Sequence, residues 1–275
     1  MMNTLVLKKE EFLFLKDFIY QHIGISLSEQ KIYLVQGRLN KRLKELRLDS
    51  FKEYCDLLRN DVAQKELSYL STFISTNVTS FFREGSQWKF LEENLAKITH
   101  SKNKKLRIWS AASSTGEEPY SIIMFLYEHL NDVLHWDIKL LATDISTKVL
   151  KQAKEGKYKS KAYSQLEARY RAKYFTKVQH SEDEYTIKEM IKKDIVFRIF
   201  NLVTGNYKIF AKKKFDIIFC RNVMIYFDKA TQSELVKNFY DLLEPGGYLF
   251  IGSSEALTDL RKGFKLVSPS IYQKV

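Results

Sequence analysis

The sequence predicts an α/β fold with a mostly parallel sheet, preceded by a smaller all-α domain, and three observations support this prediction. From Leu106 onward, short apolar segments alternate with amphipathic ones, a pattern typical of strands that alternate with helices. The stretch Arg107–Ser121, RIWSAASSTGEEPYS, has a break of small residues followed closely by a proline, as expected where a strand turns into a helix. Residues 5–76, in contrast, contain no proline and almost no strand-like alternation.

Composition limits the class of protein. The chain has 275 residues, of which 45% are hydrophobic, enough for one large domain or two smaller ones. No apolar run approaches the ~18 residues of a membrane span, and the first residues lack the pattern of a signal peptide. Cys55 and Cys220 are far apart in the sequence, which favours a reducing cytoplasm. The five histidines are scattered, so no metal site is expected.

The formal net charge is +12, and much of the excess lies in one internal segment. Residues 148–193 carry 13 Lys and Arg against 6 Asp and Glu. A basic surface attracts nucleic acid, anionic lipid or an acidic protein, and charge alone does not choose among them.

The helical region, residues 1–76, divides at recognisable breaks. Gly24–Ser26 interrupts a first apolar stripe that runs from Phe12 to Ile19, and Ser28 suits the N-cap of the next helix. That helix, Gln30–Leu48, is predicted from apolar residues at spacings of three and four: Ile32, Val35, Leu39, Leu43 and Leu46. A further short helix is expected from Phe51.

Basic side chains are expected on the far and flanking sides of this second helix: Arg38, Lys41, Arg42 and Lys44. A charge run of this kind is usually a solvated helix face. It also suits a docking surface for an acidic partner. The residues themselves leave both interpretations open.

Small and acidic residues follow the first predicted strand of the α/β region. Ser113 to Gly116 let a ligand approach the backbone, and ligands of open α/β sheets lie at the carboxyl ends of strands. Glu117 and Glu118 suit ribose hydroxyls, an amine or a cationic ligand better than a phosphate. An ordinary strand–turn–helix with a capping carboxylate is the alternative.

A second unusual stretch, Ser75–Leu91, interleaves polar residues with Phe81 and Phe82. Asn77, Thr79 and Arg83 are either parts of a helix start and a local ion pair, or groups that the segment delivers into a ligand site. The sequence allows both readings.

The remaining elements follow in order. The next predicted strand, Lys139–Thr143, ends in Asp144, and an acidic residue at this position suits hydrogen bonds from ribose hydroxyls. Ser146 is expected to cap a helix, residues 155–193 form a basic insertion with a hairpin near Tyr185–Ile187, and a helix spans Lys229–Leu243. The later predicted strands are Ile195–Phe200, Phe215–Cys220, Tyr248–Gly252 and a closing antiparallel pair, Phe264–Val267 and Ile271–Val275.

Four motifs in this order resemble the chemotaxis receptor methyltransferases of the CheR family. They are TNVTSFFRE at 76–84, SAASSTGEEPYS at 110–121, ATDIS at 142–146 and FCRNVMIYFD at 219–228. The resemblance implies a class I S-adenosylmethionine-dependent methyltransferase fold, with a doubly wound, mostly parallel seven-stranded sheet. It further implies a receptor-docking helical domain at 1–76 and a catalytic domain at 77–275, with a small β-subdomain inserted at about 155–193.

The resemblance also implies an activity and a site. Family members transfer a methyl group from S-adenosylmethionine to glutamate side chains on the cytoplasmic helices of chemoreceptors, leaving S-adenosylhomocysteine. Arg83 and Tyr226 would face the reacting groups, and no metal is implied. A glutamate carboxylate is already an anionic nucleophile, so no general base is required. The residues implied to bind the cofactor are Asn77, Thr79, Arg83, Glu118, Asp144, Asn201, Leu202, Asn222 and Val223.

One departure concerns the partner. Some family members bind a tethering peptide of the receptor through a glycine-rich loop in the β-subdomain, but Thr176–Thr186, TKVQHSEDEYT, has no glycine. We therefore expect a tether-independent, monomeric, cytoplasmic enzyme that acts on the receptor bundle without nucleic acid or membrane insertion. Two alternatives stay open: a nucleic-acid methyltransferase of the same fold, whose base-flipping motif after the fourth strand is absent here, and a non-catalytic signalling adaptor.

Overall fold

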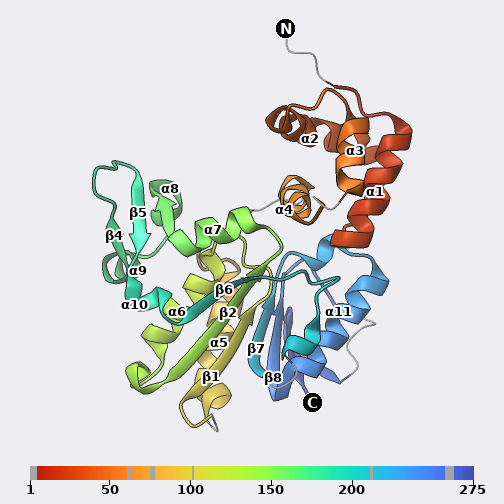
Figure 1. Ribbon diagram of the computed structural model, residues 1–275. Helices are drawn as coiled ribbons and strands as arrows, with labels where there is room; N and C mark the ends of the chain where they lie inside the picture. Colours follow the sequence, from red (N-terminus) through yellow and green to blue (C-terminus); the bar gives the residue numbers. More distant parts are fainter. Residues whose placement is uncertain (1–4, 61–62, 75–77, 101, 211–212, 258–262) are drawn as a thin grey trace.

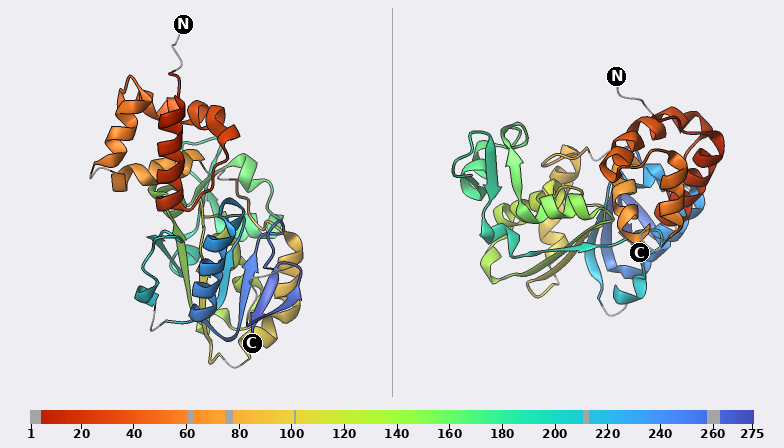
Figure 2. Two further views of the ribbon diagram at one scale, coloured as in Figure 1. Left: turned by 90° about the vertical axis from the view of Figure 1, so that its right-hand side faces the viewer. Right: turned by 45° about the horizontal axis from the view of Figure 1, so that its top comes forward.

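The computed structural model describes residues 5–60, 63–74, 78–100, 102–210, 213–257 and 263–275. A helical domain sits above one end of an α/β domain, and a small insertion stands apart from it above the same end (Figure 1). Seen with its top turned forward, the molecule shows these two parts on opposite sides of the sheet (Figure 2, right). In the described part of the chain, no helix is long and apolar enough to cross a membrane.

The central sheet has the predicted mixed architecture. Among the described residues it has seven strands, of which five are parallel, and the antiparallel pair β10–β9 closes one edge. In spatial order they are β6 (Ile195–Ile199), β2 (Asp137–Asp144), β1 (Lys105–Ser110), β7 (Phe215–Cys220), β8 (Leu243–Ile251), β10 (Ile271–Lys274) and β9 (Phe264–Ser268). The strand β7 is buried along its whole length, as its largely apolar sequence predicts.

Helices and turns cover the two faces of the sheet unequally. One face packs against α5 (Gly85–Thr99), α6 (Glu117–His129) and the insertion, and the other packs against α11 and the turn η3. The remaining elements of this domain are η2 (Val133–His135), α7 (Thr147–Glu155), η3 (Tyr207–Phe210), η4 (Met224–Tyr226) and α11 (Lys229–Leu242). As predicted, Ser146 caps α7, because its Oγ accepts a hydrogen bond from the Val149 backbone N–H.

The insertion forms the expected β-subdomain. Its three short strands pair antiparallel in the order β3–β5–β4, so β3 and β4 are its edges. Its elements are β3 (Lys157–Lys159), α8 (Ser160–Tyr163), α9 (Ala168–Tyr174), β4 (Phe175–Lys177), β5 (Glu184–Ile187) and α10 (Glu189–Lys192). Buried aromatic residues such as Tyr158 and Phe175 join it to the main core through Phe81.

The helical domain has its own core, built from the predicted apolar stripes. Its elements are α1 (Lys9–Ile23), η1 (Glu29–Lys31), α2 (Ile32–Leu46), α3 (Phe51–Arg59) and α4 (Ala63–Ile74). Ser28 precedes η1, but its side chain makes no capping hydrogen bond there. Gly24 ends α1 in the left-handed conformation, with φ 78°, which an L side chain rarely adopts.

Two sequence predictions are corrected here. Arg42 was expected on a far or flanking side of the second helix, but it is buried, because its guanidinium pairs with the buried carboxylate of Glu66. The fifth strand was expected to start at Tyr248 after a Pro-Gly-Gly turn. Instead β8 already begins at Leu243, which pairs with Phe215, and the turn residues form an irregularity within the strand.

Candidate active site

A pocket opens at the carboxyl ends of β1, β2, β6 and β7, where ligands of open α/β sheets bind. It lies under the helical domain, because Ile23 and Ile25 form part of its wall. Every described residue that the motifs implied for cofactor binding or reaction lines this pocket: Thr79, Arg83, Glu118, Asp144, Asn201, Leu202, Asn222, Val223 and Tyr226. Asn77 lies outside the described residues.

The loop between β1 and α6 is fixed by its own backbone. The Ser113 N–H donates to the Thr143 carbonyl oxygen at 2.8 Å, and the Ser114 N–H donates to Asp144 Oδ2 at 2.9 Å. Gly116 then turns with φ 98° into α6, where a Cβ would lie 2.9 Å from the Tyr158 hydroxyl. The Oγ atoms of Ser113 and Ser114 are buried and have no hydrogen-bond partner among the described residues. Because Ser114 lines the pocket, its orphaned hydroxyl suits a polar ligand.

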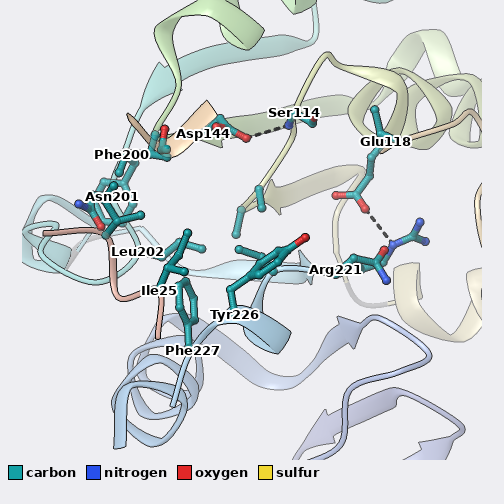
Figure 3. Close-up of a pocket in the computed structure, with 18 of the residues that line it drawn as sticks. Ile25, Ser114, Glu118, Asp144, Phe200, Asn201, Leu202, Arg221, Tyr226 and Phe227 are labelled. Carbon is teal, nitrogen blue, oxygen red and sulfur yellow. Dashed lines mark hydrogen bonds and ion pairs between the residues drawn. The ribbon is translucent and has the colours of Figure 1, made fainter. Parts of the chain in front are cut away.

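Asp144 ends β2 and is held in place before any ligand arrives. Its Oδ1 accepts from the Ser146 N–H at 2.9 Å, while its Oδ2 accepts from the Ser114 N–H (Figure 3). Burial raises the pKa of Asp144, and these backbone N–H groups act in the opposite direction. Because Asp144 lines the pocket, its two carboxylate oxygens can also accept hydrogen bonds from two adjacent hydroxyls of a ligand.

At the opposite end of the pocket lies an ion pair between Glu118 on α6 and Arg221 after β7 (Figure 3). Arg221 Nε is 2.9 Å from Glu118 Oε2, although its N–H is not aimed at that oxygen, and the Ser110 hydroxyl donates to Glu118 Oε1 at 2.6 Å. Burial raises the pKa of Glu118, while Arg221 and Ser110 act to lower it. The pair thus offers an anionic and a cationic group side by side.

Sequence reasoning missed Arg221, although it lies inside a motif that was singled out. Its guanidinium also donates to the Gln87 side chain at 3.0 Å and to the Arg83 carbonyl oxygen at 3.1 Å, and its side chain is only 3% exposed. An arginine directly after a buried, largely apolar central strand is a signal that could have identified it, because a buried arginine requires an anionic partner.

Arg83 comes from the segment before α5. The backbone there is folded tightly: Phe82 and Glu84 have φ of 50° and 63°, and the Trp88 indole N–H donates to the Arg83 carbonyl oxygen at 2.9 Å. The guanidinium is partly exposed and donates only to the Val78 carbonyl oxygen, at 2.9 Å, among the described partners. Most of its N–H donors therefore remain available at the pocket.

Tyr226 is positioned by the helical domain, which the sequence did not indicate. The Ser26 N–H donates to the Tyr226 carbonyl oxygen at 3.0 Å, and Ile25 pairs with Phe227 as an isolated antiparallel bridge. The Asn201 side-chain amide donates to the His22 carbonyl oxygen at 2.6 Å. In Figure 3 the Tyr226 ring lies between Leu202 and Arg221, facing the cavity.

Asn222 follows Arg221 in a left-handed conformation, with φ 58°. Its backbone N–H donates to Glu255 at 3.0 Å, and its amide donates to Glu84 at 3.3 Å, so the turn after β7 is held by two carboxylates. The described residues contain no group of three or more His, Cys, Asp or Glu that could hold a metal ion. The titratable residues among the described pocket lining are two carboxylates, two arginines and a tyrosine.

Comparisons with known proteins agree with this geometry. Residues 77–272 match the family model for the CheR methyltransferase SAM binding domain, and residues 10–75 match the model for the CheR methyltransferase all-alpha domain. A chemotaxis protein methyltransferase of Borreliella burgdorferi is 39% identical over 97% of this chain and 94% of its own length. That of Escherichia coli is 35% identical over 99% of this chain and 93% of its own length.

Among solved structures, the glycopeptide N-methyltransferase MtfA aligns with a TM-score of 0.33 and 15% identity over 58% of this chain and 54% of that chain, too weak a likeness to carry an argument. The family models, in contrast, match most of both domains. The two relatives are each more than a third identical to this chain over nearly its full length. The chain therefore belongs to the CheR methyltransferase family, because the two models of that family match residues 10–75 and 77–272 and both relatives are similar over nearly its full length.

Proposed function

We propose that this chain transfers the methyl group of S-adenosylmethionine to glutamate side chains on the cytoplasmic helices of chemoreceptors, forming glutamate methyl esters. One observation carries the proposal. The described titratable residues that line the pocket are Arg83, Glu118, Asp144, Arg221 and Tyr226, with no His, Lys or Cys among them. Such a set can orient an anionic acceptor through the arginines, and an ionised carboxylate acceptor needs no general base to attack a methyl group.

The pocket fits the cofactor at three points. The Asp144 carboxylate, which lines the pocket, can accept hydrogen bonds from the two ribose hydroxyls, and Ser114 Oγ, buried without a partner among the described residues, suits a further polar atom. The Glu118–Arg221 pair suits the ammonium and carboxylate of an amino-acid end, because each group can exchange part of its present contact for an opposite charge. When bound, S-adenosylmethionine supplies an electrophilic methyl group on a positively charged sulfur.

Arg83 and Tyr226 orient the acceptor in this proposal. A glutamate has an unperturbed pKa of about 4.3 and is therefore ionised at neutral pH. The free N–H donors of Arg83 can hold one carboxylate oxygen and leave the other in line with the methyl group. The phenol of Tyr226 can donate to the same carboxylate. The rate gain then comes from positioning and from exclusion of water.

The acceptor helices would dock on the helical domain. Lys41 and Lys44 are exposed on α2, and Arg38, partly exposed, donates to two carbonyl oxygens at the end of α4. We keep these three as the proposed docking residues and omit the buried Arg42. We also propose that the enzyme is a tether-independent, cytoplasmic monomer divided at residue 76, and that it binds no nucleic acid.

The chemical stability of the product tests the activity. Purified protein, radiolabelled S-adenosylmethionine and receptor-containing membranes should give labelled receptor, and mild alkali should release that label as volatile methanol, because esters hydrolyse and N-methyl bonds do not. Arg83→Ala should abolish most of the transfer, whereas the matched variant Arg59→Ala, at an exposed arginine paired with Asp56, should retain it. Alkali-stable label, or label in nucleic acid, would contradict the proposal.

A further inference from the structure

The face of β2 and β6 that is turned away from α6 has no covering helix in the described part of the chain. On this side α11 and η3 pack against β7 and β8, and Figure 1 draws no helix in front of β2 and β6. Strands of parallel sheets are normally buried on both faces. The connection after β6 contributes only the four-residue turn η3 among its described residues, which is too short to cover them.

A groove of about 880 Å³ occupies this place. Leu141 of β2 and Val196 of β6, which are register partners, lie on its floor. Val196 is 38% exposed, and Ile199 and Ile209 at the sides are each 62% exposed. These apolar side chains would be buried in a complete doubly wound layer, so their exposure together marks an interaction surface.

The charged residues of the groove all have one sign. Five cations line it and no carboxylate does, among the described residues: Arg107, Lys139, Arg198, Lys213 and Lys214. Arg107 pairs with Asp137, and Lys214 donates to the Asp241 carbonyl oxygen. Among the described residues Arg198 donates only to the adjacent Phe197 carbonyl oxygen, and the exposed Lys139 has one carboxylate nearby, that of Asp137, which also pairs with Arg107. An occupant must therefore present apolar residues to the floor and negative charge to the rim.

We propose that this groove docks an acidic amphipathic helix of a partner protein, which supplies the covering layer that the chain lacks over β2 and β6. A helix is favoured because helices are what pack on the faces of parallel sheets. The apolar floor lies in a groove and takes the apolar stripe of the helix, while Lys139 and Arg198 pair with carboxylates that flank the stripe.

Phe200 lines both this groove and the cofactor pocket, so the two sites share a wall.

The test uses the full chain and a designed probe. The probe is a fluorescent 18-residue helical peptide of Leu, Ala and Glu, with Leu at positions i, i+3, i+4 and i+7 and Glu beside them. Anisotropy titration should show saturable binding that weakens at least about tenfold between roughly 50 and 300 mM salt. A peptide with Lys in place of Glu should not bind. No saturable binding of the acidic peptide would overturn the proposal.

Two pairs of substitutions locate the site. Lys139→Glu with Arg198→Glu should weaken peptide binding about tenfold or more, and Val196→Ser should weaken it without any change of charge. Lys148→Glu with Lys151→Glu, at exposed residues of α7 on the other side of the sheet, changes the net charge equally and should leave binding intact. Equal loss in both charge-reversed pairs would overturn the proposal in favour of a general field effect.

Two other occupants are outcomes of the same experiments. Cosedimentation with vesicles of phosphatidylserine and phosphatidylcholine that is lost in Lys139→Glu/Arg198→Glu, without peptide binding, would overturn the proposal in favour of a lipid surface. A dimer in light scattering that the same pair of substitutions dissociates would overturn it in favour of a second copy of this chain. A monomer that binds the peptide and not the vesicles supports it.

Discussion

Arg42 is buried, although Lys41 and Lys44 on the same helix are exposed. Its Nε and Nη2 donate to the two carboxylate oxygens of Glu66, both at 2.8 Å, and the Tyr54 hydroxyl donates to the same carboxylate at 3.0 Å. The two charged side chains are 11% and 3% exposed. The pKa of Tyr54 is raised mainly by burial and in addition by the nearby Glu66 charge. Tyr54 therefore stays a neutral hydrogen-bond donor. The network joins α2, α3 and α4.

Arg42→Ala should therefore destabilise the protein, because it leaves the buried Glu66 without its counter-charge. We expect a loss of about 3–5 kcal/mol in the free energy of unfolding, measured by urea denaturation. Lys41→Ala, one residue away and exposed, is the matched control and should change stability by less than about 0.5 kcal/mol. Equal, small effects of the two changes would show that the pair contributes little.

Glu118 leads to a prediction about pH. Burial raises its pKa above the ordinary value of 4.5, and burial also raises the pKa of Asp144. The ammonium group and the ribose hydroxyls, which S-adenosylmethionine and S-adenosylhomocysteine share, favour the ionised carboxylates, so acidification toward these raised pKa values protonates the carboxyls and weakens binding. Calorimetry with S-adenosylhomocysteine should show affinity falling as the pH is lowered from about 7 to 5, before ordinary carboxylates protonate.

Glu118→Gln should lower the affinity at neutral pH and flatten part of this pH dependence, since glutamine does not titrate. Glu182→Gln, at an exposed carboxylate in the insertion, should keep the full profile. An affinity that stays constant down to pH 5 in the unsubstituted protein would contradict an ionised pocket with raised pKa values.

At the scale of elements, the segment after α1 acts as a clamp on the turn η4. Its backbone pairs with Tyr226 and Phe227, and the Tyr20 hydroxyl on α1 donates to Asp228 at 2.5 Å. Asp228 in turn caps α11 by accepting from the Thr231 N–H. The helical domain is thus part of the scaffold that fixes η4, which carries Tyr226.

Gly24→Ala tests this clamp. Gly24 has φ 78°, and a Cβ there would lie 2.4 Å from Val203 Cγ2, so the segment has to move. We expect a loss of about 1–3 kcal/mol in stability and a lower kcat, with the Michaelis constant for the receptor little changed. Gly37→Ala in α2, where nothing lies within 4 Å, should instead stabilise by about 0.5–1 kcal/mol. An unchanged kcat in a folded Gly24→Ala protein would exclude the positioning role.

Across the whole molecule, the two domains meet through polar contacts as well as through the clamp. The Thr147 N–H donates to Ser68 Oγ at 2.7 Å, and the hydroxyls of Thr72 and Ser146 are 2.6 Å apart, so α4 is bonded to the start of α7. Residues of α4 and of the end of β2 line the pocket, and Figure 1 shows α2 farther from the α/β domain than α4. The proposed docking residues and the reacting groups are therefore on separate parts of one scaffold.

Lys41→Glu with Lys44→Glu should consequently raise the Michaelis constant for receptor and reduce its salt dependence, because an acidic helical bundle would lose attraction to α2. Cofactor affinity, measured by calorimetry, should not change. Lys97→Glu with Lys265→Glu, at exposed sites on α5 and β9, changes the net charge equally and should leave the Michaelis constant unchanged. The same rise in both variants would show that net charge alone matters.

The sequence by itself determined the order of the elements and the positions in the chain of the proposed site residues. The largely apolar run Phe215–Cys220 predicted β7 as a central strand, because a strand that is buried on both faces has apolar residues on both sides. Asp144 could be identified for a similar reason, since the end of a strand is a local feature. Short motifs were also enough to propose Thr79, Arg83 and Glu118 as site residues, and all three line the pocket.

Only the tertiary structure decided which distant groups meet. Nothing local to Arg221 names Glu118 as its partner, and nothing local to Tyr226 shows that Ser26 holds its backbone. The exposed face of β2 and β6 likewise depends on where helices far away in the chain pack. The burial of Arg42 has the same cause: helix periodicity assigns a side, but the packing of α4 places Glu66 there and turns a surface position into an interior one.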